Sequence, residues 1–570
     1  MPQKENKIIF MKLFKIKINY MYPKISKLFT KILKFFLDPR RWIIAYQRWI
    51  ENKNKSKLWL EFDEILKNKL KIQSKSEGEV ILVDGLWDNP NHFFRLRIFL
   101  EALYKKNELY LIAFLKNRNS RSKETLSALG FDKFFYISDF PINDEDKKRA
   151  LSILKSVKSH EDLLKIKLPE NLPPYILYDT VLKISKHPQT NLSSELWMEN
   201  LSDLYRLDRF YNHIFKTSNI KKIVLSHVRK NEFGLLLQKG IKRKITCFNI
   251  YAAYEMMRIR RFDDLCDLEK PMETYSYKEY STLEDNIKES IIKAGKNYLN
   301  PGNLNKNTDI NFTRAYGMQS SKIDLKKRLS IPKGKTIVTV YFHSWYDFPH
   351  AYGMKNFTDF LDWTNSTLKI ARKRKDIVWL LKPHPCESWY GGFFLNQLTK
   401  NLPKNIHTLD ESTSVLTALE ISDFSVTVHG TISLESVAKG VPVICADKTW
   451  FEDWNFAYVA SSKSDYEEKL LNINVNSFKV NKKMQNKASV CAYLTMAPAE
   501  QEIKIKRLIS DHFPPSKIFS DLMKIICKDN SYINDQGDLI MNWLESNNKN
   551  FCIYHKINFH KDYPKNRIIN

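Results

Sequence analysis

The sequence predicts an α/β protein built from two parallel-sheet domains. Short apolar runs alternate with stretches of helical periodicity in two separate parts of the chain, as strands and helices do in such domains. The apolar runs end repeatedly in polar loops. Because ligands of open parallel sheets bind beyond the carboxyl ends of the strands, these loops are the candidate functional sites.

Length and composition indicate a folded protein with more than one domain. The chain has 570 residues, of which 43% are hydrophobic, enough for two or more full-sized cores. Its formal net charge of +28 predicts attraction to a polyanionic surface or substrate. The seven cysteines form no Cys-x-x-Cys pair, so we expect reduced thiols in a cytosolic protein. We expect neither a transmembrane helix nor a signal peptide, because lysines interrupt the apolar pieces near the N-terminus.

Residues 1–75 are predicted to form a basic, helical N-terminal extension. Up to residue 58, fifteen Lys or Arg face only three acids, with aromatic side chains between them. Residues 25–36 have apolar side chains at helical spacing and lysines on the opposite face. This pattern is typical of a helix lying on an anionic membrane surface. It is equally consistent with a basic helix packed on the protein's own surface.

The first predicted domain covers residues 76–320. Gly85 permits a tight turn after its first strand, and Asn91 is predicted to cap the following helix. Gly130 is expected to end the second helix. A loop rich in Asn, Pro and Gly begins at residue 300 and marks the boundary zone. Strands are predicted at 79–83, 110–114, 134–137, 223–225 and 245–251, and helices at 93–104, 121–129 and 232–240 and over most of 144–208.

The second predicted domain covers residues 321–510, and a helical tail follows at 511–570. Apolar runs bounded by polar loops again predict strands, and apolar residues at helical spacing predict the helices. Strands are expected at 336–341, 377–381, 424–428 and 441–446, with a long amphipathic helix at 357–374 and mainly helices over 464–545.

The loop Lys382-Pro383-His384-Pro385 comes directly after one of these strands. Its two prolines stiffen the backbone, so the histidine between them is held at a fixed point. A histidine there can hydrogen-bond a phosphate oxygen or supply a proton to a leaving group, and the lysine adds a positive charge. The alternative is a histidine that caps a neighbouring backbone carbonyl.

A second polar loop runs from His429 to Glu435 after the next predicted strand. Gly430 lets the backbone approach a ligand closely, while Thr431 and Ser433 place hydroxyls and amides at a helix N-terminus, which favours phosphate. Glu435 is positioned to accept hydrogen bonds from sugar hydroxyls. The alternative is an ordinary helix cap with a first-turn carboxylate. The hydroxyls of residues 412–414 either add to this site or form a simple turn.

Polar residues also follow the first strand of each domain. His343 and Asp347 end the first strand of the second domain and are expected to face the same crevice as the loops above. In the first domain, Asp84 is a candidate base for removing a proton from an acceptor hydroxyl. The alternative is that Asp84 and Gly85 only form a turn, since Asp-Gly is a common turn pair. The other candidates on this acceptor side are Asp88, His92 and His227.

Three aspartates at positions 263, 264 and 267 form an acidic cluster. Their spacing matches no dedicated cation site. We therefore interpret them as a solvated face, and we predict no metal site and no cofactor.

The second half of the chain resembles bacterial glycosyltransferases of capsule and surface-polysaccharide biosynthesis, a group related to capsule Kdo transferases and polysialyltransferases. The likeness covers roughly residues 80–460. In the first half it includes the Asp84-Gly85 turn and Ser226-His227. In the second half it is carried by the turn His343–Asp347, the helix start Phe357–Trp363, Leu381–Pro385, His429–Glu435 and Gly440–Ile444.

The resemblance implies a GT-B-like fold, in which two Rossmann-like domains face a cleft that holds the active site. It implies that His384 contacts the donor phosphate, that Thr431 and Ser433 hold phosphate, and that Glu435 binds the ribose or sugar. Asp84 would be the base. The implied activity is inverting, metal-independent transfer of a sugar from a nucleotide-activated donor, with a CMP-sugar favoured. The nucleotide-sugar is then a substrate and not a cofactor.

The acceptor implied by the resemblance is a capsule or surface polysaccharide, or a lipid-linked precursor of one. The basic extension would hold the protein at the inner face of the cytoplasmic membrane, on an anionic surface. Three alternatives stay open: a CDP-alcohol phosphotransferase of the teichoic-acid type, a UDP-sugar epimerase on the same fold, and a non-enzymatic nucleic-acid-binding protein. The last is disfavoured because the positive charge is diffuse and no nucleic-acid-binding module is recognisable.

Overall fold

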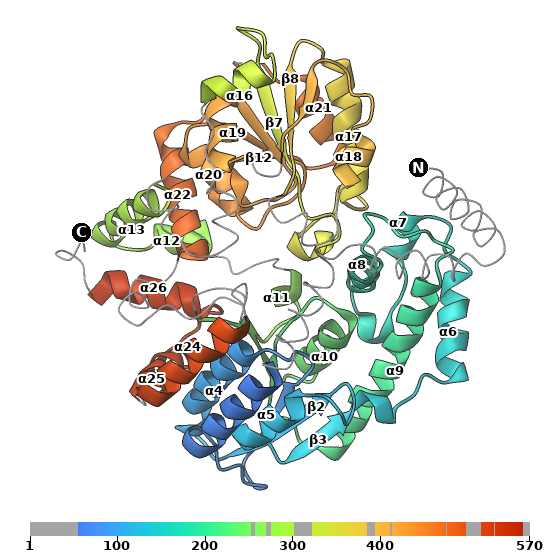
Figure 1. Ribbon diagram of the computed structural model, residues 1–570, viewed down its shortest axis with the longest axis vertical. Coiled ribbons are helices and arrows are strands. Elements are labelled where there is room, and N and C mark those ends of the chain that lie inside the picture. Colours follow the sequence, from blue (N-terminus) through green and yellow to red (C-terminus); the bar gives the residue numbers. More distant parts are fainter. Residues whose placement is uncertain are drawn as a thin grey trace, which may run out of the picture.

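Two six-stranded sheets, each covered by helices, form the body of the protein (Figure 1). The structure is a computed structural model. The predicted membrane-surface helix at residues 25–36 lies outside the described residues. Within them, no helix is both long and apolar enough to cross a membrane. The structure describes residues 55–251, 257–269, 275–300, 322–384, 394–410, 413–474, 476–497, 515–528 and 531–562.

The first sheet has the strand order β3-β2-β1-β4-β5-β6. Its first five strands are parallel, and β6 pairs with β5 in the antiparallel direction. This order is that of the Rossmann fold, in which the chain reverses its direction of travel across the sheet between β1 and β4. The strands are β1 (Glu79–Asp84), β2 (Leu109–Leu115), β3 (Lys133–Tyr136), β4 (Lys222–Leu225), β5 (Thr246–Tyr251) and β6 (Arg258–Phe262).

The second sheet has the order β12-β11-β10-β7-β8-β9, and all its pairings are parallel. Read from β9, it repeats the order of the first sheet, with the reversal between β7 and β10. The predicted fold class, α/β with two Rossmann-like domains, is therefore confirmed. The strands are β7 (Ile337–Tyr341), β8 (Val378–Lys382), β9 (Ile406–Thr408), β10 (Phe424–Thr427), β11 (Val443–Cys445) and β12 (Tyr458–Val459).

Helices connect the strands in both domains and cover the sheet faces. The first domain contains α4 (Pro90–Tyr104), α5 (Ser122–Leu129), α6 (Asp144–Leu154), α7 (His160–Leu163), α8 (Pro174–Ser185), α9 (Glu195–Thr217), α10 (Asn231–Lys242) and α11 (Cys266–Glu269), with short 3-10 turns η1 (Ile137–Asp139) and η2 (Pro169–Asn171). The second contains α16 (Lys322–Arg328), η3 (Pro349–Tyr352), α17 (Phe360–Lys373), α18 (Phe394–Leu398), α19 (Val415–Ile421), α20 (Ile432–Ala438), η5 (Glu452–Trp454), α21 (Lys463–Leu471) and α22 (Lys482–Met496).

Helix α4 is buried almost all round, because one side faces the first sheet and α25 covers another. Its cap is Asn89, whose side chain accepts hydrogen bonds from the backbone amides of Asn91 and His92. The predicted cap, Asn91, is instead inside the helix, where its side chain accepts from Arg95 Nε at 3.3 Å. The prediction was wrong because Pro90 takes the first helical position and moves the start towards the N-terminus.

Three strands were not predicted from the sequence. β9 and β12 are only three and two residues long, too short to show a periodic pattern. β6 contains three arginines, but Arg258 and Arg260 are buried because their guanidinium groups donate to backbone carbonyls of Thr495 and Asp267. A strand stabilised by such distant partners has no apolar signature in its own sequence.

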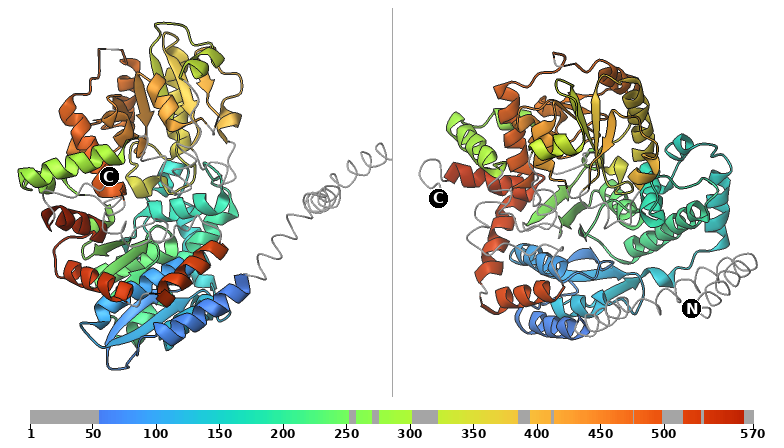
Figure 2. Two further views of the ribbon diagram at one scale, coloured as in Figure 1. Left: turned by 60° about the vertical axis from the view of Figure 1, so that its left-hand side comes forward. Right: turned by 45° about the horizontal axis from the view of Figure 1, so that its top comes forward.

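The C-terminal helices return to the first domain (Figure 2). They are α24 (Pro515–Lys528), α25 (Ser531–Leu544) and α26 (Phe551–Asp562). Helices α24 and α25 pack on α4, and α26 contacts both β6 and α22. The helix over residues 55–69 joins the same cluster, because Trp59 and Phe62 pack on Phe519. This part of the basic extension is packed on the protein itself.

Helices α12 (Tyr277–Ser281) and α13 (Asp285–Tyr298) lie before the predicted domain boundary at residue 320. They nevertheless pack with elements of the second domain. Tyr280 contacts Trp454 of η5 with ring centroids 5.2 Å apart, and Gly295 lies against the backbone of Ser489 in α22. Residues 277–298 are therefore part of the core of the second domain.

Candidate functional site

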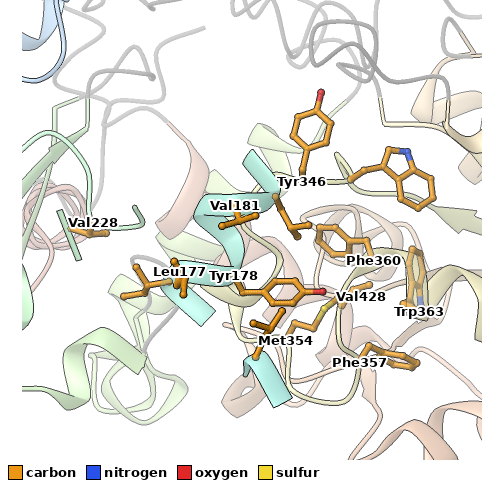
Figure 3. Packing of buried hydrophobic residues seen from close by; sticks show 14 of the residues in the cluster. Leu177, Tyr178, Val181, Val228, Tyr346, Met354, Phe357, Phe360, Trp363 and Val428 are labelled. Atoms are coloured by element: carbon orange, nitrogen blue, oxygen red, sulfur yellow. The ribbon is translucent and has the colours of Figure 1, made fainter. Parts of the chain in front are cut away.

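The carboxyl ends of the two sheets face each other. The loop after β4 meets the loop after β7, since the guanidinium carbon of Arg229 lies 5.8 Å from the ring centroid of Tyr352. One hydrophobic cluster continues from the first domain into the second. In Figure 3, the side chain of Tyr178 from α8 reaches among residues of the second domain. Both reversal points of strand order, where ligands of such sheets bind, therefore lie at the boundary between the domains.

Two histidines meet at the reversal point of the second sheet. His343 follows β7 and His429 follows β10, and their ring centroids are 4.8 Å apart. His343 is fixed by a hydrogen bond between its Nε2 and Thr427 Oγ1 at 3.1 Å. It also stacks on Phe360, with centroids 4.6 Å apart and the planes almost parallel. The neighbouring strands thus bring together two residues that are 86 positions apart.

Both rings are uncharged near neutral pH. Burial lowers the pKa of His429 to about 3. Burial also holds the pKa of His343 well below its usual value, and the neighbouring His429 and His384 lower it further. Neither ring nitrogen of His429 has a hydrogen-bond partner in the part of the chain that the structure describes. Since buried polar atoms are nearly always hydrogen-bonded, this ring is a candidate to contact a bound molecule.

Lys382 and His384 lie at the same edge of the sheet. Lys382 is the last residue of β8 and is 1% exposed. Its ammonium group lies 3.3 Å from the carbonyl oxygen of Pro383. His384 follows two residues later and is close enough to His343 to affect its pKa. One cation and three imidazoles are thus grouped near the ends of three adjacent strands, as an anionic leaving group would require.

The predicted site residues around α20 face different parts of the structure. A Cβ added at Gly430 would lie 2.9 Å from Thr427 Oγ1 and 3.4 Å from the His343 ring, so the backbone here passes close to the site. Thr431 precedes the helix and is half-buried. Ser433 is fully buried, and its hydroxyl lies 3.4 Å from Cys445 Sγ. The predicted contact of this hydroxyl with phosphate does not fit, because the side chain faces the sheet.

Glu435 is 8% exposed. It lines a cavity of about 180 Å³ between α13, α19, α20 and α22. Two exposed lysines are also among the residues that line it. Ser414, which was considered as a further hydroxyl of the site, caps α19 by accepting from the amide of Leu416. The cavity is lined by Lys296, Leu299, Leu416, Glu435, Ala438, Lys439 and Ser489.

At the reversal point of the first sheet, Asp84 joins β1 to β4. Its carboxylate accepts hydrogen bonds from the backbone amide of Ser226 and from the Ser226 hydroxyl, the latter at 2.8 Å. The side chain is 1% exposed, and burial raises its pKa to about 6 although the bonds from Ser226 lower it. The raised pKa suits a base, but both carboxylate oxygens already have partners within the protein.

Two further histidines lie beside Asp84. His92 and His227 both contact the ring of Trp87, with centroid distances of 5.8 and 4.8 Å. Burial lowers the pKa of His92 to about 3 and that of His227 to about 4. Asp88 is exposed and accepts a hydrogen bond from the Ser122 hydroxyl. The structure therefore gathers the predicted acceptor-side residues except Asp88, which lies further out.

Residues of α8 and η3 at the domain boundary were not singled out from the sequence. His350 Nδ1 lies 2.7 Å from Asp179 Oδ1, and the His350 amide donates to Asp179 Oδ2 at 3.1 Å. Asp347, a predicted donor contact, forms an ion pair with Lys183 at 2.6 Å. A proline directly before His350, as before His384, is the only local signal. Asp179 lies within a helix and has no signal of its own.

The acidic cluster is only in part the solvated face that was predicted, since Asp263 and Asp264 are exposed and Asp267 is buried. Asp267 is 3% exposed and accepts from the backbone amides of Asp263 and Asp264. Lys549, near the start of α26, pairs with Asp263 and Asp267. The sequence could not show this, because the lysine is more than 280 residues away. Among the described residues, no group of three His, Cys, Asp or Glu side chains is arranged to hold a metal ion.

No protein-family model matches the chain, and no curated protein matches it in sequence. Among solved structures, it is similar to KpsC of Thermosulfurimonas dismutans, a beta Kdo 2,4 transferase, with 10% identity, a TM-score of 0.31 and coverage of 48% of this chain and 80% of that one. It is also similar to the UDP-GlcNAc 2-epimerase of Neisseria meningitidis bound to UDP-GlcNAc, with 14% identity, a TM-score of 0.19 and coverage of 72% and 97%. A third is Anabaena HepE in complex with UDP and glucose, with 9% identity, a TM-score of 0.24 and coverage of 79% and 100%. At these values the likenesses do not identify a reaction.

Proposed function

We propose that the protein is a glycosyltransferase that moves a sugar from a nucleotide-activated donor to a capsule or surface-polysaccharide acceptor. The observation that carries this proposal is the group of imidazoles at the reversal point of the second sheet, facing the first domain. His343 and His429 pack together there with His384 nearby. The motif resemblance of the sequence supports the same activity and favours a CMP-sugar.

The second domain binds the donor in this proposal. Lys382 and His384 neutralise the leaving phosphate, and the amide end of α20 at Thr431 adds its partial positive charge. Gly430 allows the phosphate to approach the backbone. Glu435 accepts hydrogen bonds from hydroxyls of the ribose or sugar. The cavity that Glu435 lines is the space for these groups.

The first domain presents the acceptor. His92 and His227 line this side, Asp88 lies further out, and Asp84 stays a prediction as the base. The acceptor is a polysaccharide or its lipid-linked precursor, reached from the inner face of the cytoplasmic membrane, where the basic N-terminal extension would bind anionic lipid. Transfer inverts the anomeric centre and needs no metal, because side chains neutralise the phosphate. Undiminished activity in EDTA is therefore expected.

The test is transfer by the full chain and by His384→Ala and Glu435→Ala, with CMP-sugars, UDP-sugars and CDP-glycerol as donors. We expect transfer from a nucleotide-sugar and its loss in both variants, with an unchanged unfolding midpoint. Full activity in either variant would refute its role. Transfer from CDP-glycerol alone would indicate a phosphotransferase, and release of free epimerised sugar without acceptor would indicate an epimerase.

A further inference from the structure

His350 and Asp179 form a buried pair that joins the two domains. His350 belongs to η3 of the second domain and is 7% exposed, while Asp179 belongs to α8 of the first and is fully buried. The two hydrogen bonds between them, at 2.7 and 3.1 Å, fix both the ring and the backbone of His350. Tyr175 and Tyr178 enclose the ring, at centroid distances of 6.2 and 5.3 Å.

The pairing determines which ring nitrogen can take up a proton. A carboxylate oxygen only accepts hydrogen bonds, so Nδ1 of His350 carries the hydrogen that Asp179 accepts. In the neutral ring, Nε2 then keeps its lone pair, as in other Asp–His pairs that act as bases. Nε2 is buried and has no hydrogen-bond partner among the described residues.

Nε2 of His350 is one of three such nitrogens on the second domain's side of this boundary, within the described residues. Both ring nitrogens of His429 are also buried without a partner within the described ranges, and His350 lies close enough to His429 to lower its pKa. Tyr352, two residues after His350, is 5.6 Å from the His429 ring. Buried polar atoms are nearly always hydrogen-bonded, so this group of nitrogens indicates a place for a polar group of a ligand.

Carboxylates lie on two sides of the His350 ring. Asp179 faces the ring from α8, and Asp447, which follows β11, is close enough for His350 to affect its pKa. Asp447 is held by the backbone amides of Lys355 and Asn356. His429, the neighbour after β10, is uncharged near neutral pH, and Lys183 of α8 is paired with Asp347. Two carboxylates thus lie near this position.

We propose that His350, positioned by Asp179, is the proton acceptor of the sugar transfer. This inference rests on the proposed function. The acceptor oxygen forms a bond to the anomeric carbon, and the bond from that carbon to the phosphate oxygen breaks, with its electron pair staying on the phosphate. The hydroxyl proton passes to His350 Nε2 and then to solvent. Asp84 lies elsewhere, with both of its oxygens bound by Ser226.

The test compares His350→Ala, Asp179→Asn and the control His407→Gln in the full chain, with the donor and acceptor that the wild type uses. His407 lies in the edge strand β9. We expect kcat to fall about 100-fold or more in the first two variants, with little change in the KM for the donor and none in the control. Added imidazole should restore part of the activity of His350→Ala, which a structural role would not allow.

Full kcat in His350→Ala, or a loss that imidazole does not restore, would overturn the assignment while leaving the proposed transferase intact. Asp84→Asn provides the competing result, because a loss of kcat confined to that variant would make Asp84 the base. Absence of transfer by the wild type from every donor would overturn the proposed function, and this inference with it.

Discussion

The two domains have the same strand order, but the polar side chains at their reversal points differ in their hydrogen bonding. In the first, Ser226 donates twice to Asp84, while both ring nitrogens of His92 are buried without a partner among the described residues. In the second, His343 has one partner in Thr427, and His429 has none among the residues described. A crevice whose hydrogen bonds are internal is stabilised by them, whereas one with unsatisfied donors and acceptors is suited to a ligand. We therefore expect the internally paired Asp84 to be mainly structural and His429, unpaired within the described residues, to be mainly a binding residue.

The largest expected contrast is between alanine substitutions of two glycines, Gly430 after β10 and Gly85 after β1. In Gly430→Ala, the new methyl would contact Thr427 Oγ1 at 2.9 Å and the His343 ring at 3.4 Å. Displacing that ring should lower transfer about 100-fold, with little change in the free energy of unfolding. In Gly85→Ala, the methyl would instead meet Leu115 and, at 2.9 Å, Leu126. This overpacking should cost about 1–3 kcal/mol of stability.

Steady-state kinetics and urea unfolding of both variants measure this contrast. The reverse pattern, with Gly430→Ala unstable but active and Gly85→Ala stable but inactive, would exchange the roles of the two crevices.

A smaller difference is expected from the hydroxyls that hold the crevices. Ser226→Ala leaves a buried oxygen of Asp84 with one donor fewer, which should lower the free energy of unfolding by about 1–3 kcal/mol and leave nucleotide affinity unchanged. Thr427→Ala releases His343 and should weaken nucleotide binding more than it lowers stability. Ser156→Ala, at an exposed serine, is the control. Equal loss of nucleotide affinity in the Ser226 and Thr427 variants would contradict the division of roles.

The last expected effect, and the smallest near neutral pH, is the pH dependence of stability. His429 has a pKa of about 3 when folded and an ordinary value of 6.5, so the unfolded state binds more protons between these values. Its contribution to stability is therefore complete above pH 6.5 and falls as the pH drops towards 3, by about 1.4 kcal/mol for each pH unit. Asp84, with a pKa raised to about 6, has the opposite sign and offsets part of the effect of His92 and His227 in the first crevice.

His429→Gln should therefore lose less stability than the wild type between pH 6.5 and 4, as measured by urea unfolding at each pH. His187→Gln, at an exposed site, serves as the control. Parallel curves for His429→Gln and the wild type would show that this ring is not buried in its neutral form.

The fold could be predicted because its main strands are apolar runs that are buried within the two helix-covered sheets. The meeting of His343 and His429 followed from the rule that strand ends gather at one edge. Side-chain direction could not be predicted, so the sequence did not show that the Ser433 hydroxyl lies against Cys445. The pair of Asp179 and His350 spans 171 positions and depends on how two domains meet, which no local pattern encodes.

The most direct test of the central claim is thermal unfolding of the wild type, His384→Ala and Ser226→Ala with CMP, CDP, UDP or GDP. Binding to the folded state stabilises it by about 2.7 kcal/mol at 100 times the Kd. If the second crevice holds the nucleotide, at least one of the four should raise the Tm of the wild type and of Ser226→Ala, and raise that of His384→Ala less or not at all. The claim is contradicted if none raises the Tm of the wild type, or if the shift persists in His384→Ala and disappears in Ser226→Ala.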